Sequence, residues 1–241
     1  MQSSLYVALS SQIALEKRLT TTANNVANMA TAGFRAEEIK FAELLGRSNR
    51  GEVAFVGPGT NTISRAAGPT TKTEAPLDVA VQGDVWLAVS GPKGTLYTRD
   101  GRFTMDATGQ IRTLTGLPVV DPGGGPVQLD PQAGPPTIGR DGSLYQNRNQ
   151  VGAIGLFTID RKAALARGPD NTVSASIPGR AVQDFTRVGM IQGYVEGANV
   201  NPILEMTKLI AIQRAFESAA SMTSEADNTL TGAVKTLGPQ G

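Results

Sequence analysis

The C-terminal part of the chain carries a long seam of apolar residues, and this seam constrains the fold more than any other feature. No glycine or proline occurs between residues 203 and 230. Residues spaced alternately three and four apart are apolar at every position except one: Leu209, Ile212, Phe216, Ala219, Thr223, Ala226, Leu230, Ala233 and Leu237. This spacing gives an α-helix an a/d seam that stays in contact with water unless a second helix covers it. The pattern predicts a long helix, capped by Asn201 with Pro202 in its first turn, that needs a partner.

The N-terminal part predicts a second helix. From residue 5 to residue 30 there is no glycine or proline, and apolar residues recur at helical spacing: Leu5, Leu9, Ile13, Leu19, Ala23, Val26 and Ala30. The Thr20-Thr21-Thr22 run weakens this helix because branched side chains lose rotamer freedom in a helix. We therefore expect it to be marginal alone and to order when it packs, ending at Ala32-Gly33 with Gly33 in a left-handed cap.

The middle of the chain reads as short strands and turns. Apolar stretches such as residues 77–81 and 85–89 alternate with turn signals, and Asp100-Gly101 predicts a hairpin between residues 96–99 and 102–105. A second Asp-Gly pair, Asp141-Gly142, predicts another turn. Residues 39–45 are expected to add a short helical piece, and residues 46–68 an extended connector. Turn signals at this spacing favour an antiparallel sandwich or open barrel.

Together these patterns predict an α+β fold with paired, coiled-coil-like terminal helices and a central antiparallel β domain. The expected organisation is a discontinuous helical assembly domain of residues 1–35 with 199–241, an extended connector of residues 36–75, and a β domain of residues 76–198.

Composition excludes several classes of function. The chain has 241 residues, with 22 Lys+Arg against 21 Asp+Glu and no clustered basic patch, so no nucleic-acid partner is expected. Without cysteine or histidine, it cannot build a disulfide, a thiolate zinc site or a Ser-His-Asp triad. No apolar stretch approaches the roughly 20 residues of a membrane-spanning helix. The first residues lack the pattern of a secretory signal peptide. No metal or cofactor is expected.

Two other functions remain open on the residues alone. One is a cell-wall glycosidase, which would need a pair of acids such as Glu37, Asp78 or Asp106. No such pair is marked by its context, and the Asp-Gly acids are those that tight turns demand. The other is a secreted β-rich binding module with a dimerising coiled coil.

Asparagines mark the end of the first helix. Asn24, Asn25 and Asn28 are poor residues for a helix interior because their amides compete for backbone groups. Asn24 and Asn28 share one face, so they either mark a fraying end or form a hydrogen-bonding row between packed helices. On the second helix, Arg214 and Glu217 are either solvated or specificity contacts at the edge of the seam.

Three separated regions resemble the signatures of one family, the flagellar rod and hook proteins. The first region is Ala23-Asn24-Asn25-Val26-Ala27-Asn28 followed by Thr31-Ala32-Gly33-Phe34-Arg35. The central region contains Leu77-Asp78-Val79-Ala80-Val81-Gln82-Gly83 and Tyr97-Thr98-Arg99-Asp100-Gly101-Arg102-Phe103. The third contains Asn199-Val200-Asn201, Glu205-Met206, Leu209-Ile210 and Gln213-Arg214-Ala215-Phe216-Glu217. Because the regions occur in the family's order, the resemblance covers the whole architecture.

The resemblance implies a structural, self-assembling subunit without catalysis or a cofactor. In that family, terminal helices form an inner tube, a β domain forms the outer layer, and subunits stack helically into a hollow periplasmic shaft. It also implies export through the flagellar type III apparatus without a cleaved signal peptide. The implied partners are other copies of the chain and other rod subunits, with the surrounding rings as further candidates. The stretch Gly83-Asp84-Val85-Trp86-Leu87-Ala88-Val89 is more similar to proximal rod subunits than to distal rod or hook subunits.

The residues expected at the assembly interface lie on the two helices and in the motifs beside them. They are Leu9, Ile13, Asn24, Asn25, Val26, Asn28, Gly33, Phe34, Asn199, Asn201, Met206, Leu209, Ile212, Gln213, Arg214, Phe216, Glu217 and Leu230.

We expect Phe216→Asp to abolish assembly while the β domain stays folded. The physical reason is that a carboxylate cannot be buried unpaired in a packed seam without a large desolvation cost. The measurements are cell motility and imaging of the rod. A motile cell with an intact rod would show that the seam is not an interface.

Overall fold

The computed structural model describes residues 2–41, 43–48, 51–57 and 59–237, and the chain falls into two compact units. The helical unit comprises Met1–Ala27, Glu37–Asn61 and Asn201–Gly241. The β unit comprises Asn28–Ala36 and Thr62–Val200. Residues 28–35 and 62–75, which the sequence analysis assigned to the helical domain and the connector, therefore cluster with the β unit. The fold is α+β.

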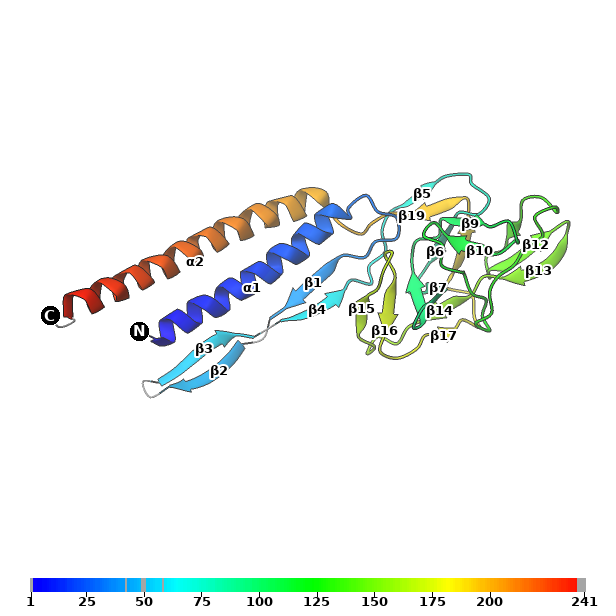
Figure 1. The fold of residues 1–241 in the computed structure, drawn as a ribbon. Coiled ribbons are helices and arrows are strands. Elements are labelled where there is room, and N and C mark those ends of the chain that lie inside the picture. Colours follow the sequence, from blue (N-terminus) through cyan, green and yellow to red (C-terminus); the bar gives the residue numbers. More distant parts are fainter. Residues whose placement is uncertain (1, 42, 49–50, 58, 238–241) are drawn as a thin grey trace. The chain divides into compact units, whose positions relative to one another are not determined.

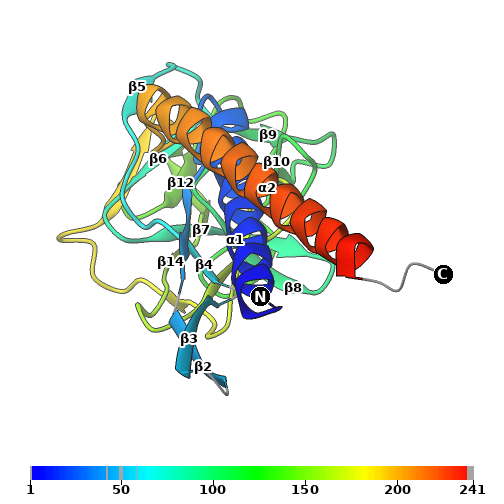
Figure 2. The same cartoon turned by 90° about the vertical axis from the view of Figure 1, so that its left-hand side faces the viewer.

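In the helical unit, two long helices lie side by side (Figures 1 and 2): α1, Gln2–Ala27, and α2, Pro202–Leu237. The predicted start of α2 is confirmed, because the Leu204 amide donates to Asn201 Oδ1 over 3.2 Å and Pro202 is the first helical residue. The end of α1 differs from the prediction. The helix stops at Ala27, and turns follow as far as Gly33.

Strands complete the helical unit. They are β1, Glu37–Lys40; β2, Glu43–Ser48; β3, Gly51–Val56; and β4, Thr60–Ile63, which crosses into the β unit. β2 and β3 form an antiparallel hairpin, and β1 pairs with β4. The helical piece expected at residues 39–45 is therefore wrong. The side chains of Ile39 and Phe41, two residues apart, both lie beside Gly59. Side chains at every second position share one side in a strand but not in a helix.

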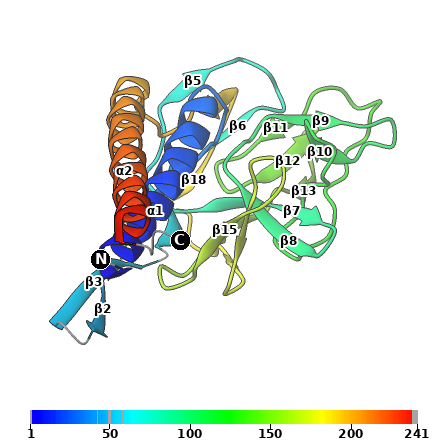
Figure 3. The same ribbon diagram turned by 60° about the vertical axis from the view of Figure 1, so that its left-hand side comes forward.

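The β unit is built from short antiparallel strands. Its strands are β5, Thr70–Lys72; β6, Val79–Gln82; β7, Trp86–Gly91; β8, Gly94–Thr98; β9, Phe103–Met105; β10, Ile111–Thr113; β11, Thr137–Ile138; β12, Ser143–Gln146; β13, Asn149–Ala153; β14, Leu156–Thr158; β15, Leu165–Arg167; β16, Val173–Ala175; β17, Arg180–Ala181; β18, Gly189–Gln192; and β19, Tyr194–Glu196. The largest sheet has the order β15-β16-β8-β7-β14-β17, and Figure 3 shows its β7–β8 pair. The predicted antiparallel β domain is confirmed.

The two Asp-Gly turns have different outcomes. Asp141-Gly142 lies in the turn that joins the antiparallel strands β11 and β12, as predicted. The hairpin predicted at Asp100-Gly101 is wrong, because β8 and β9 belong to different sheets. There the Gly101 carbonyl accepts a hydrogen bond from the Val79 amide over 2.9 Å, and a Cβ at Gly101 would collide with the Val79 carbonyl. The glycine is needed for this close approach of β6 rather than for a hairpin.

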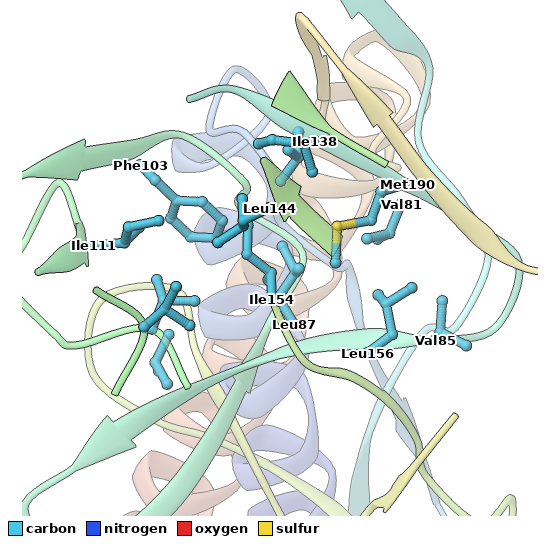
Figure 4. Close-up of a cluster of buried hydrophobic side chains, with 14 of the residues drawn as sticks. Val81, Val85, Leu87, Phe103, Ile111, Ile138, Leu144, Ile154, Leu156 and Met190 are labelled. Atoms are coloured by element: carbon cyan, nitrogen blue, oxygen red, sulfur yellow. The ribbon is translucent and has the colours of Figure 1, made fainter. Parts of the chain in front are cut away.

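The main core of the β unit is a cluster of aliphatic side chains (Figure 4). Leu87, Ile111, Leu144 and Ile154 are fully buried in it, and Met190 closes one side. A second cluster gathers around Trp86, Tyr97 and Phe157. Because strands distant in sequence supply both clusters, the β unit depends on contacts that local turn signals cannot specify.

We expect Leu144→Ala to lower the free energy of unfolding of the β unit by about 2–5 kcal/mol, because the deletion leaves a cavity in a close-packed core. Leu144 is 0% exposed. Leu114→Ala is the matched control, since Leu114 is 56% exposed and should change the stability little. Denaturant unfolding followed by Trp86 fluorescence measures both. Equal losses in the two variants would contradict the assignment of the core.

Candidate assembly surface

The predicted seam is the least exposed side of α2. Ile212 is buried, and Leu209, Phe216, Ala219 and Thr223 are partly buried. The same three–four spacing extends back to Glu205, which is only 7% exposed. The side chains of Ala226, Leu230, Ala233 and Leu237 lie outside the described residues. A charged residue therefore occupies the first position of the seam.

The inward face of α1 differs from the predicted stripe. Ala14, Thr22 and Asn25 are buried, whereas Leu9 is 48% and Ile13 is 51% exposed. The buried positions of α1 are small or polar, whereas the buried side of α2 carries larger apolar side chains such as Ile212. On α1, Leu9 and Ile13 are left largely exposed, and the side chain of Leu5 lies outside the described residues.

Asn25 connects three segments of the helical unit. Its Oδ1 accepts the Glu37 amide over 2.9 Å, and its Nδ2 donates to the Glu37 carbonyl over 2.9 Å and to Glu205 Oε2 over 3.2 Å. The other Glu205 oxygen accepts Lys208 Nζ over 2.6 Å. Asn25 thus makes a hydrogen bond between the helices, whereas the row predicted for Asn24 and Asn28 stays a prediction. α1, α2 and β1 are held in one register by this amide.

The neighbouring positions of the first motif have other roles. Asn24, Val26 and Asn28 are partly buried. Asn28 accepts hydrogen bonds from Thr31, with its Oδ1 from the hydroxyl over 3.2 Å and its carbonyl from the amide over 3.0 Å. Asn28 thus ties the turn that follows α1.

Gly33 and Phe34 lie in the β unit. Gly33 has φ +66°, so its predicted left-handed conformation is confirmed. Its amide donates to the Glu196 carbonyl over 2.7 Å, and a Cβ would collide with the Arg99–Asp100 backbone. Phe34 is 2% exposed, with the guanidinium of Arg167 4.5 Å from its ring centroid.

Sequence reasoning missed a buried ion cluster in the β unit. Glu196 accepts Arg35 Nη2 over 2.7 Å on one oxygen, and Arg99 Nη2 over 2.7 Å and Nε over 2.8 Å on the other. Burial first, and then the nearby charge of Arg35, lower the pKa of Arg99 to about 10, although Glu196 opposes the shift. Arg35 stands in the first signature region between Phe34 and Ala36, and Glu196 follows Val195; these apolar neighbours are a sequence context that signals burial.

The cluster holds two arginines and one glutamate, so it carries one positive charge in excess, and both arginines lie against the ring of Trp86. The guanidinium carbons of Arg35 and Arg99 lie 5.8 and 5.9 Å from its ring centroid. Among the described residues, no hydrogen-bond acceptor reaches Arg35 Nε or Nη1. The indole ring therefore offers these buried N–H groups an electrostatic partner.

The remaining predicted residues divide between the interior and the surface. Asn199 lies in the β unit, where its side chain bonds to Ala36, Ser64 and Ala66. Asn201 caps α2. Met206, Gln213, Arg214 and Glu217 are exposed on α2.

Of the candidate catalytic acids, Asp106 is engaged in a turn, as are the two Asp-Gly acids, Asp100 and Asp141. Hydrogen bonds from the Thr108 hydroxyl and then from Arg112 hold the pKa of Asp106 well below its usual range. A carboxylic acid that acts as a general acid needs a pKa raised above its usual range, which is the opposite shift. Asp100 accepts the Arg102 amide and guanidinium, and Asp141 accepts the Ser143 amide and hydroxyl. These carboxylates stabilise turns.

Within the described part of the chain, no group of three or more acidic side chains could hold a metal ion. In the same residues, neither helix is long and apolar enough to cross a membrane.

Comparison with protein families shows which class of protein the chain resembles. Three family models match in chain order: "Flagella basal body rod protein" over residues 5–35, "Flagellar hook protein FlgE/F/G D1 domain" over residues 80–146, and "Flagellar basal body rod FlgEFG protein C-terminal" over residues 191–235. They cover α1, much of the β unit, and α2 with the strands before it. The three models describe rod and hook proteins of the flagellum.

Comparison with individual proteins is more specific. The chain is 48% identical to the flagellar basal-body rod protein FlgF of Mesorhizobium japonicum, over 99% of both chains. It is 39% identical to FlgF of Caulobacter vibrioides over 99% of both chains, and 31% identical to FlgG of the same organism over 94% and 96%. The chain belongs to the flagellar basal-body rod protein family, and it is a structural subunit of the rod.

We expect Asn25→Asp to destabilise the helical unit by about 1–3 kcal/mol, because it leaves the Glu37 carbonyl without its donor and places a carboxylate beside Glu205. Circular dichroism during denaturant unfolding measures the change. Asn228→Asp, at an exposed position of α2, is the matched control and should leave the transition in place. Coincident curves for Asn25→Asp and the unsubstituted chain would exclude this contact as a determinant of helix register.

Proposed function

We propose that the chain assembles helically with copies of itself and with other rod subunits to form the proximal part of the rod. In this proposal the terminal helices pair in a coiled-coil-like manner within each subunit, and their outer faces make the contacts between subunits. The chain has a mechanical role and carries out no catalysis.

The outward-facing apolar side chains carry this proposal. Leu9 and Ile13 on α1 are about half exposed, and on α2 Ile203 is 79%, Met206 is 43% and Ile210 is 52% exposed. The three residues of α2 follow the three–four spacing of a second ridge, separate from the seam that includes Ile212. Because an exposed apolar ridge on a helix marks an interaction site, we assign it to neighbouring subunits.

The proximal position is supported by similarity. Within one organism, Caulobacter vibrioides, the chain is more similar to the protein named FlgF than to the one named FlgG. The alternative is a distal rod or another axial paralogue.

Location and export follow from the same proposal. The subunit would work in the periplasmic rod after passing through the flagellar type III apparatus in an unfolded state, without a cleaved signal peptide. The export apparatus and the surrounding rings would then be further partners. A helix pair that leaves apolar side chains of both helices exposed in the single subunit suits this route, because its full stabilisation comes from burying the outer ridges on assembly.

We expect Ile210→Glu to leave the isolated subunit folded but to block rod assembly, because a carboxylate would be desolvated in the contact between subunits. Val151→Glu is the matched control: Val151 is 42% exposed on β13, away from the helices in the sequence. Motility, imaging of basal bodies and circular dichroism of the purified variants measure both effects. Assembly of Ile210→Glu into normal rods would refute the use of this ridge.

A further inference from the structure

The chain passes between its two units four times, after residues 27, 36, 61 and 200. On the β-unit side, these passages are bordered by three segments: 28–36, 62–68 and 196–200. We infer that Glu196 and Asn199 connect these three segments into one cooperative joint. The segments therefore either all stay attached to one another or all become loose. The joint is defined here as Arg35, Arg99, Glu196 and Asn199.

Asn199 uses its whole amide to connect the three segments. Its Oδ1 accepts the Ala36 amide over 2.7 Å, and its Nδ2 donates to Ser64 Oγ over 3.1 Å and to the Ala66 carbonyl over 2.7 Å. Its backbone amide donates to the Phe34 carbonyl over 3.2 Å. The first and second segments are also bonded directly, from the Ser64 amide to the Ala36 carbonyl over 2.8 Å.

Glu196 repeats these connections and adds the sheet. Its side chain holds Arg35 from the first segment and accepts the Gly68 amide of the second over 2.9 Å. The same carboxylate pairs with Arg99, which lies just after β8 and also donates to the carbonyls of Val81, Gly83 and Val85. The three segments are thereby attached to the body of the β unit.

Burial makes this arrangement cooperative. Arg35, Arg99 and Glu196 are each 2% exposed, so withdrawing one partner leaves an uncompensated charge in the interior. If one segment detaches alone, the buried polar groups of the other two lose their hydrogen-bond partners. For a subunit of the rod, force that the chain carries into the β unit enters through these segments, and the joint distributes it over all three of them.

The test is amide hydrogen exchange in the purified full-length chain carrying Asn199→Ala. The Ala36 and Ser64 amides, which lie beside the lost side chain, should exchange about tenfold faster or more. The discriminating positions are Gly33 and Gly68, which bond to Glu196 and should also exchange faster. Glu196→Gln is the reciprocal variant and should accelerate exchange at Ala36 and Ser64. Asn149→Ala, at an exposed position of β13, is the matched control and should change none of these amides.

Core amides such as those of Val127 and Ile154 report whether the β unit remains folded, and they should stay protected. Faster exchange confined to Ala36 and Ser64 in Asn199→Ala would overturn the inference, because the segments would then loosen independently. Equal acceleration at the core amides would also overturn it, since Asn199 would then be a general determinant of the fold. Neither result would alter the assignment of the chain as a rod subunit.

Discussion

The buried carboxylate of Glu196 is the constraint on which the order of the β unit's edge segments depends. Removing a carboxylate and two guanidinium groups from water is costly, and the cost is offset only when hydrogen bonds saturate the charges. Here Arg35, Arg99 and the Gly68 amide supply those bonds, and the Trp86 ring faces the remaining positive charge. The segments that lead to and from the helices are consequently part of the β unit.

In the helical unit, buried polar residues set the alignment of the two helices. The buried positions of α1 are small or polar, those of α2 include Glu205 and Ile212, and the Asn25–Glu205 hydrogen bond sets the register of the two helices. A buried polar pair stabilises less than apolar packing, but it selects one alignment because any slip leaves both partners unsatisfied. Several large apolar side chains stay exposed, among them Leu9 and Ile13 on α1 and Ile203 and Ile210 on α2. This distribution suits the proposed assembly, in which a neighbouring subunit covers them.

Local signals in the sequence predicted the features that depend on local physics. The cap at Asn201, the helix start at Pro202, the left-handed Gly33 and the turn at Asp141-Gly142 each follow from backbone conformation and nearby hydrogen bonds. Predictions failed where a distant segment decided the outcome. Asp100-Gly101 fits a hairpin by composition, but contact with Val79 in β6 places the two flanking strands in different sheets.

By itself, the sequence determined that the terminal segments are helical, that the middle is antiparallel β structure, and which family the chain belongs to. Helical periodicity, turn residues and signature residues can all be recognised from residues that are close in sequence. Only the tertiary structure decided which side chains became the interior. It turned Leu9 and Ile13 outward and Asn25 inward, and it joined Arg35 to Glu196 across most of the chain's length. The physical reason is that burial of a polar group depends on whether distant partners can satisfy it, and no local pattern specifies those partners.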